Sequence, residues 1–154
     1  MKPFLILILL AGLCSNCKKN SVAPLNGRGA IDFIVTDIYG GNLLDPSNPD
    51  GYKEKDIDMY FRVKGEKKRF YNPDLTYPKN LRIHIVDSVY RLTFFADESA
   101  LQTTTFLQWR KSSVVSEDTI RCKYDKFGYL EKVWLNGVQE NSVETYGYTI
   151  KVIK

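Results

Sequence analysis

The chain has 154 residues, 44% of them hydrophobic and 26% charged, so its length suits one domain and its composition excludes wholesale disorder. The formal net charge is only +4, and the basic residues are spread along the chain, which argues against a nucleic-acid-binding surface. Their densest cluster, in the stretch "KGEKKR" at 64–69, is typical of a solvated hairpin tip. Ten Tyr, eight Phe and two Trp favour strands, because aromatic side chains suit a half-buried pleated surface.

The chain opens with a short apolar run. Phe4 to Leu13 are apolar or small, Lys2 precedes them, and polar residues end the run abruptly. A helix that spans a bilayer needs roughly 20 apolar residues, and a buried core helix would show an amphipathic period that this run lacks. The layout instead predicts a secretory signal peptide.

Two cysteines in "AGLCSNCKKN" extend this interpretation. An apolar core that ends in a cysteine resembles the signal of bacterial lipoproteins, and Asn16 before Cys17 resembles the looser signals of Bacteroidota-type lipoproteins. The resemblance implies that the thiol of Cys17 is acylated, that residues 1–16 are removed, and that the protein is anchored to the outer membrane. Cys14 is the alternative attachment point. Lys18 and Lys19 stand where an acidic surface-export signal would follow, so the face of the membrane stays open.

Residues 17–28 combine polar residues with Pro24 and Gly27, which predicts a flexible tether before a single domain at 29–154. Once Cys14 is removed and Cys17 is acylated, only Cys122 remains, so the domain would hold no disulfide. Cys122 alternates with apolar neighbours in "TIRCKY", which is typical of a small core residue.

From Gly29 onward, apolar and polar residues alternate with a period of two, which predicts strands with one buried face. In "DIDMYFRVK", the pattern places Ile57 and Val63 at the two ends of an inward face and Asp58 on the outward face. The Asn136-Gly137 pair is a strong hairpin signal. The expected strands, in chain order, are 30–38, 56–64, 68–71, 81–86, 89–96, 103–111, 119–124, 128–135 and 145–154.

Eight or nine short strands without a convincing helical segment predict an all-β fold, an antiparallel β-sandwich. The stretch "FIVTDIYGGNLLDP" at 33–46 is similar to the start of transthyretin-like and carboxypeptidase-regulatory-type modules. This resemblance implies an Ig-like or transthyretin-like sandwich and carries no activity with it.

The loop at 42–56 is rich in hard oxygen ligands of the kind that Ca²⁺ prefers. Read as a twelve-residue calcium loop, however, it has an acidic residue where glycine is needed and Pro49 at a ligand position. Asp-Pro, Asn-Pro and Asp-Gly pairs are all turn formers, so a pair of turns is the competing interpretation. The candidate ligands are Asp45, Asn48, Asp50 and Asp56.

Three aromatic residues, Trp109, Tyr129 and Trp134, are candidates for a platform that stacks on a sugar or another flat ligand. Core packing is the alternative for each ring. The parity of "YLEKVWL" does not decide whether Trp134 or Val133 faces the core.

The sequence is compatible with two functions. The first is a non-catalytic, membrane-anchored module that binds a glycan, a peptide or a partner envelope protein, without a cofactor. The second is a small metal-dependent or hydrolytic enzyme. A carboxylate pair such as Asp56 and Asp58 could serve glycoside hydrolysis, but alternating charge on a solvent face gives the same pattern. Cys122 and the single histidine, His84, show no nucleophile motif. The sequence therefore favours the binding module.

Overall fold

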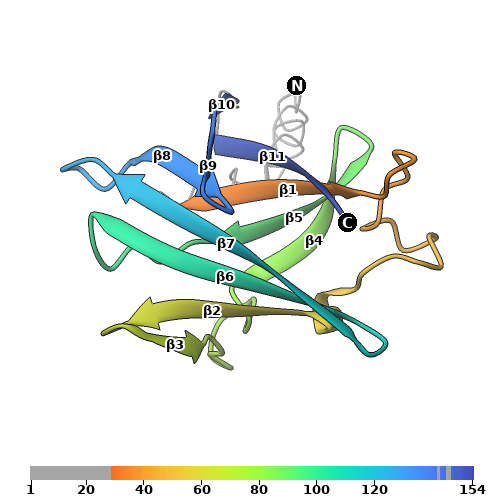
Figure 1. Ribbon diagram of the computed structural model, residues 1–154, viewed down its shortest axis with the longest axis horizontal. Helices are drawn as coiled ribbons and strands as arrows, with labels where there is room; N and C mark the ends of the chain where they lie inside the picture. Colours follow the sequence, from red (N-terminus) through yellow and green to blue (C-terminus); the bar gives the residue numbers. More distant parts are fainter. Residues whose placement is uncertain (1–28, 142, 145–146) are drawn as a thin grey trace, which may run out of the picture.

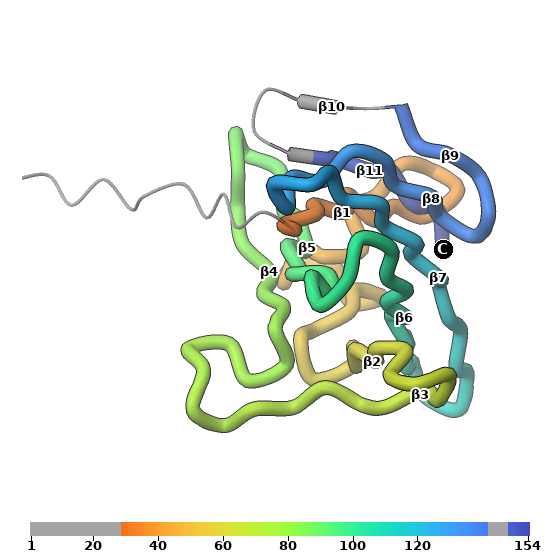
Figure 2. Tube along the Cα trace, turned by 90° about the vertical axis from the view of Figure 1, so that its left-hand side faces the viewer, coloured from red at the N-terminus to blue at the C-terminus, as the bar shows by residue number. Residues whose placement is uncertain are grey.

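The computed structural model describes residues 29–141, 143, 144 and 147–154. Their strands form two sheets, which we call sheet A and sheet B, and which appear as separate layers in two views (Figures 1 and 2). This confirms the prediction of an all-β fold built from two sheets. The only helical element in the described part of the chain is one short 3₁₀ turn, η1 (Glu54–Asp56).

Sheet A has the strand order β10-β11-β1-β5-β4. Strands β1 and β11 pair in parallel, and the other pairs are antiparallel, so the first and last described strands lie side by side at the centre of the sheet (Figure 1). The strands are β1 (Ala30–Thr36), β4 (Leu81–Val86), β5 (Val89–Phe95), β10 (Val143–Glu144) and β11 (Gly147–Ile153).

Sheet B is antiparallel throughout and has the order β3-β2-β6-β7-β8-β9. Its longest ladder joins β6 and β7 through ten residue pairs, from Gln102 opposite Lys123 to Lys111 opposite Val114. The strands are β2 (Ile57–Val63), β3 (Glu66–Arg69), β6 (Gln102–Lys111), β7 (Val114–Tyr124), β8 (Leu130–Leu135) and β9 (Val138–Glu140).

The core lies between the inner faces of the two sheets. Alternate residues of each strand enter it, as the period-two pattern requires. Phe33 from β1 meets Phe94 from β5 edge to face, with ring centroids 5.1 Å apart. Sheet B contributes Trp109, which packs against Tyr52. The largest fully buried side chains are Trp109, Phe33, Phe94, Ile31, Leu44, Ile57, Met59, Leu92, Leu107, Ile120, Ile150 and Val35.

Strand positions agree broadly with the sequence pattern, although several bounds differ: β1 ends at Thr36 instead of 38, and β3 spans Glu66–Arg69 instead of 68–71. β7 begins at Val114, five residues earlier than expected, because it pairs with the whole of β6. The short strands β9 and β10 were not expected. In β2, Ile57 and Met59 are buried as predicted, but Val63 is 40% exposed because it lies at the β2–β3 hairpin, beyond the core.

Among the residues that the structure describes, no helix has the length and apolar character needed to cross a membrane.

Candidate functional site

Basic side chains gather on the outer face of sheet B. The strand register places the same parity outward on neighbouring strands, so Tyr60 on β2, Phe106 on β6, Thr119 on β7 and Arg69 on β3 share this face. We call this surface the basic face. Its cationic side chains are Arg62, Lys67, Arg69, Arg110, Arg121, Lys123 and Lys132.

Asp58 organises one end of the basic face. Its carboxylate accepts a hydrogen bond from the Arg69 guanidinium at 2.7 Å and pairs with Arg110 at 3.0 Å and with Lys79 at 3.1 Å. The Asp58 side chain is only 4% exposed, whereas those of Arg69 and Arg110 are about half exposed. Burial alone would raise the pKa of Asp58, but hydrogen bonds from Arg69 and Lys79 and their charges hold that pKa below its ordinary value.

This corrects the sequence interpretation of Asp58 as a solvated residue on an alternating face. Asp58 does point outward, but long cationic side chains cover it. Arg69 arrives from the adjacent strand β3, and Lys79 reaches over from the segment before β4, where its ammonium also donates to the Ile57 carbonyl at 2.8 Å. The alternation of residues within β2 does not predict these contacts, because they come from other segments of the chain.

Aromatic rings lie beneath the cations in the middle of the basic face. Lys67 pairs with Glu117 and passes over two rings, with its Nζ 4.6 Å from the centroid of Tyr60 and 5.1 Å from that of Phe106. Arg62 also lies over Phe106, with its guanidinium carbon 5.4 Å from the ring centroid. Such cation–π contacts hold long side chains along the sheet and explain why Phe106 is only 7% exposed on an outer face.

Arg121 and Trp134 form the other end of the basic face. They are opposite each other on β7 and β8, and the Arg121 guanidinium lies 4.4 Å from the ring centroid of Trp134. No carboxylate of the described residues is paired with Arg121 in the structure. Beside them, Lys123 pairs with Glu131 at 2.8 Å. This end therefore presents a cation and a partly exposed indole together.

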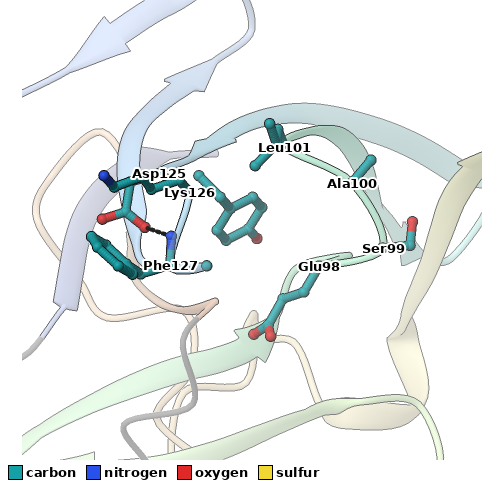
Figure 3. Close-up of a pocket in the computed structure, with 9 residues that line it drawn as sticks. Glu98, Ser99, Ala100, Leu101, Asp125, Lys126 and Phe127 are labelled. Atoms are coloured by element: carbon teal, nitrogen blue, oxygen red, sulfur yellow. Dashed lines mark hydrogen bonds between the residues drawn. The ribbon is translucent and has the colours of Figure 1, made fainter.

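A separate cavity of about 440 Å³ lies where the β5–β6 loop meets the β7–β8 hairpin. Figure 3 shows Glu98 to Leu101 on one side and Asp125 to Phe127 on the other. The Asp125 carboxylate accepts hydrogen bonds from the backbone N–H groups of Phe127 and Tyr129, at 2.8 and 2.9 Å, so it shapes the hairpin rather than the cavity.

Tyr124 contributes the most deeply buried polar group of this cavity. Burial raises the pKa of its phenol, and the nearby Glu98 charge raises it further, so the hydroxyl stays protonated. A side chain at Gly29 would clash here, because an added Cβ would lie 2.9 Å from the Tyr124 hydroxyl and 2.8 Å from a Glu98 carboxylate oxygen. Glycine at position 29 therefore lets the backbone lie close to Glu98 and Tyr124.

The three aromatic candidates do not form one platform. Trp109 is 1% exposed and lies in the core, where its Nε1 donates to Asp118 at 2.8 Å. Tyr129 is 60% exposed in the β7–β8 hairpin, and Trp134 lies on the basic face. The parity of β8 is thereby decided: Val133 is buried, and Trp134 points outward.

The loop at 42–56 uses its oxygens to form turns. Asp45 accepts hydrogen bonds from the backbone N–H and the hydroxyl of Ser47, which lower its pKa. Asn48 accepts from the backbone of Asp50, whose carboxylate pairs with Lys111 at 2.9 Å. The Asp56 carboxylate accepts from the Lys53 backbone N–H at the start of η1.

Within the described ranges, no three His, Cys, Asp or Glu side chains converge as a metal site would require. The arrangement of the 42–56 loop is that of the competing interpretation, a series of turns.

His84 has an orienting partner that the sequence did not reveal. Its Nε2 lies 2.6 Å from the Thr93 hydroxyl, which donates a hydrogen bond to Asp32 at 2.5 Å. Because the hydroxyl proton goes to Asp32, His84 meets Thr93 as a donor and not as the base that a nucleophile needs. Burial lowers the pKa of His84, and the nearby charge of Arg82 lowers it further.

Cys122 is fully buried and free, and burial raises the pKa of its thiol to about 12. A thiol in this environment is protonated at neutral pH and is not a nucleophile. Its predicted place as a small core residue is confirmed. Cys14 and Cys17 lie outside the described residues.

Sequence reasoning missed the basic face because its cations come from five strands. Within any one strand they read as ordinary outward charges. The available signal was the repeated outward parity in "MYFRV" and "FLQWR", which could be combined only after the strand order was known. Comparison with protein-family models, curated proteins and solved structures found no match to this chain.

Proposed function

We propose that this chain is a cell-envelope lipoprotein whose β domain is a non-catalytic binding or assembly module. Acylated Cys17 would anchor it to the outer membrane, with Cys14 as the alternative, and residues 17–28 would tether the domain. The apolar run and the cysteines of "FLILILLAGLCSNC" support the anchor. Two packed, mainly antiparallel sheets support an Ig-like or transthyretin-like sandwich.

The basic face is the single observation that carries the binding role. It is an exposed surface on a continuous sheet, and its arginines are held in place before any partner arrives. Asp58 positions Arg69 and Arg110, while half of each arginine side chain stays exposed. Preorganised charged groups bind with a smaller loss of side-chain entropy than flexible ones. The face suits a partner that carries negative charge.

A hydrolytic enzyme is the less favoured alternative. The groups that could act as nucleophile or base make other contacts: Cys122 is buried, and Thr93, next to His84, is only 4% exposed and donates its hydroxyl proton to Asp32. Asp58 is enclosed by three cations. None of these groups lines the cavity between the β5–β6 loop and the β7–β8 hairpin.

The anchor is tested by cell fractionation. Wild-type protein and Cys14→Ala should remain in the membrane fraction, whereas Cys17→Ala should be released or left unprocessed. The reverse pattern would move the attachment to Cys14, and a double variant that is processed to the size of the wild type and still retained in the membrane would contradict the lipoprotein proposal.

The binding role is tested with the full-length protein in detergent and three polyanions: polygalacturonate, phosphatidylglycerol vesicles and poly(dT). We expect salt-sensitive binding to at least one of them, and Arg121→Glu should weaken it. Absence of binding to all three would contradict an anion-binding role.

A further inference from the structure

We propose that the basic face binds an anionic polysaccharide, whose sugar carboxylates pair with the cations of sheet B. This inference rests on the proposed binding role and names the ligand class. The charge of the basic face, its extent across the sheet and its scarcity of exposed aliphatic side chains support this ligand class.

The basic face has more cations than carboxylates. The seven cations of the basic face meet only three carboxylates, those of Asp58, Glu117 and Glu131. Residues 29–154 hold 18 basic and 18 acidic residues and therefore have no formal net charge, because the other four basic residues of the chain come before residue 29. The excess of four cations on the basic face is therefore offset by an acidic excess elsewhere in the domain, so positive charge is concentrated on one face of one sheet, and the ligand that complements this face is anionic.

The extent of the face indicates a polymer. The cations occupy β3, β2, β6, β7 and β8, which are consecutive in sheet B (Figure 1). Neighbouring strands lie about 4.8 Å apart, so this set spans roughly 19 Å across the sheet, and cations two residues apart on one strand are about 7 Å apart. A single small anion would contact only one part of such an array. A chain with repeated negative charges can contact it throughout.

Trp134 indicates a sugar chain. Its indole is partly exposed at the Arg121 end of the face, where a ring and a guanidinium lie together. An indole stacks on the apolar face of a pyranose ring, while the guanidinium pairs with a carboxylate on the same residue. At the Asp58 end, the exposed N–H groups of Arg69 and Arg110 offer the same planar recognition of a carboxylate.

Anionic membrane surfaces and single-stranded nucleic acid fit the basic face less well than a polysaccharide does. Protein faces that bind membrane surfaces also insert large apolar side chains. The strand register places only one exposed aliphatic residue of the described chain, Val115, on the basic face. Single-stranded nucleic acid needs a series of rings for stacking bases. Lys67 lies over the rings of Tyr60 and Phe106, and Arg121 lies over that of Trp134, so the basic face does not present a series of open rings.

The test measures binding of the full-length protein in detergent to immobilised polygalacturonate, with neutral dextran as the reference polymer. We expect binding to polygalacturonate and not to dextran, and we expect it to weaken at least tenfold between about 0.05 M and about 0.3 M salt, because exposed charges are screened. Arg121→Glu should weaken binding at least tenfold. Trp134→Ala should weaken it about threefold to tenfold without changing the salt dependence, since the indole contributes by stacking.

Lys151→Glu is the matched control, because Lys151 is an exposed lysine on β11 of sheet A and undergoes the same change of charge. This variant should bind like the wild type. Equal weakening in Lys151→Glu and Arg121→Glu would overturn the assignment to the basic face, and equal binding to dextran would overturn the anionic class.

Binding only to phosphatidylglycerol vesicles or only to poly(dT) would overturn the polysaccharide while leaving the proposed binding role intact. Failure with every polyanion would overturn both. The circular dichroism spectrum of each variant shows whether it retains the native β structure.

Discussion

Lys154 and Asp118 form a buried ion pair between the two sheets, with Nζ and Oδ2 2.6 Å apart. Lys154 directly follows β11 of sheet A, and Asp118 lies on β7 of sheet B. Asp118 also accepts hydrogen bonds from the indole of Trp109 at 2.8 Å and from the amide of Asn136 at 2.9 Å. The Asp118 carboxylate therefore connects the end of β11 in sheet A with β6, β7 and the β8–β9 turn of sheet B.

The first prediction concerns this connection. Lys154→Gln removes the cation and leaves the Asp118 carboxylate, only 5% exposed, with neutral donors alone. Loss of one partner of a buried pair costs up to about 3–5 kcal/mol, and the remaining donors should limit the loss here to about 2–3 kcal/mol. Urea unfolding measures it. Lys151→Gln, at an exposed position of β11, should change stability by less than about 0.5 kcal/mol. Similar values for the two variants would contradict a role for the ion pair.

The second prediction concerns pH. The pKa of Asp58 is lowered in the folded protein, so its ion pairs contribute stability above the ordinary carboxyl pKa of about 4, and this contribution is lost as pH falls through the lowered folded value. Unfolding of the wild type at pH 7 and in steps below pH 4 should show this loss. Asp58→Asn should be less stable at pH 7 and should show a shallower decline in acid. An unchanged acid slope in the variant would mean that other carboxyl groups cause the decline.

The third prediction concerns the core thiol. In the Cys14→Ala/Cys17→Ala variant, Cys122 should not react with a thiol reagent at pH 8 while the protein is folded, because its pKa is about 12 and it is buried. It should react fully in denaturant. Rapid modification of the folded protein would show that the strands around Cys122 open readily.

The fourth prediction distinguishes the two tryptophans. Trp134→Phe leaves only Trp109, which is 1% exposed, so acrylamide should quench its fluorescence weakly. The wild type should be quenched more strongly, and iodide should widen the difference, because the anion is concentrated near the cations around Trp134. Equal quenching of both proteins would place Trp134 in a protected environment and would remove it from the basic face.

The sequence determined most of the strands of this protein and most of the core. Ile31, Phe33 and Val35 alternate strictly, and all three are fully buried, because a pleated strand sends successive side chains to opposite faces. The turn signals were equally local: Asn136-Gly137 joins β8 to β9, and both residues have the positive φ that this hairpin requires. The position of Cys122 in the core also followed from its neighbours.

Only the tertiary structure decided which outward residues meet. Asp58 was expected in solvent, yet Arg69, Lys79 and Arg110 enclose it from three separate segments. Alternation assigns a side chain to one of two faces and says nothing about what lies next to it on that face. Strand order and register supply that information through contacts between residues far apart in the chain. For this reason, a domain whose basic and acidic residues are equal in number and spread along the sequence presents a basic face once it is folded.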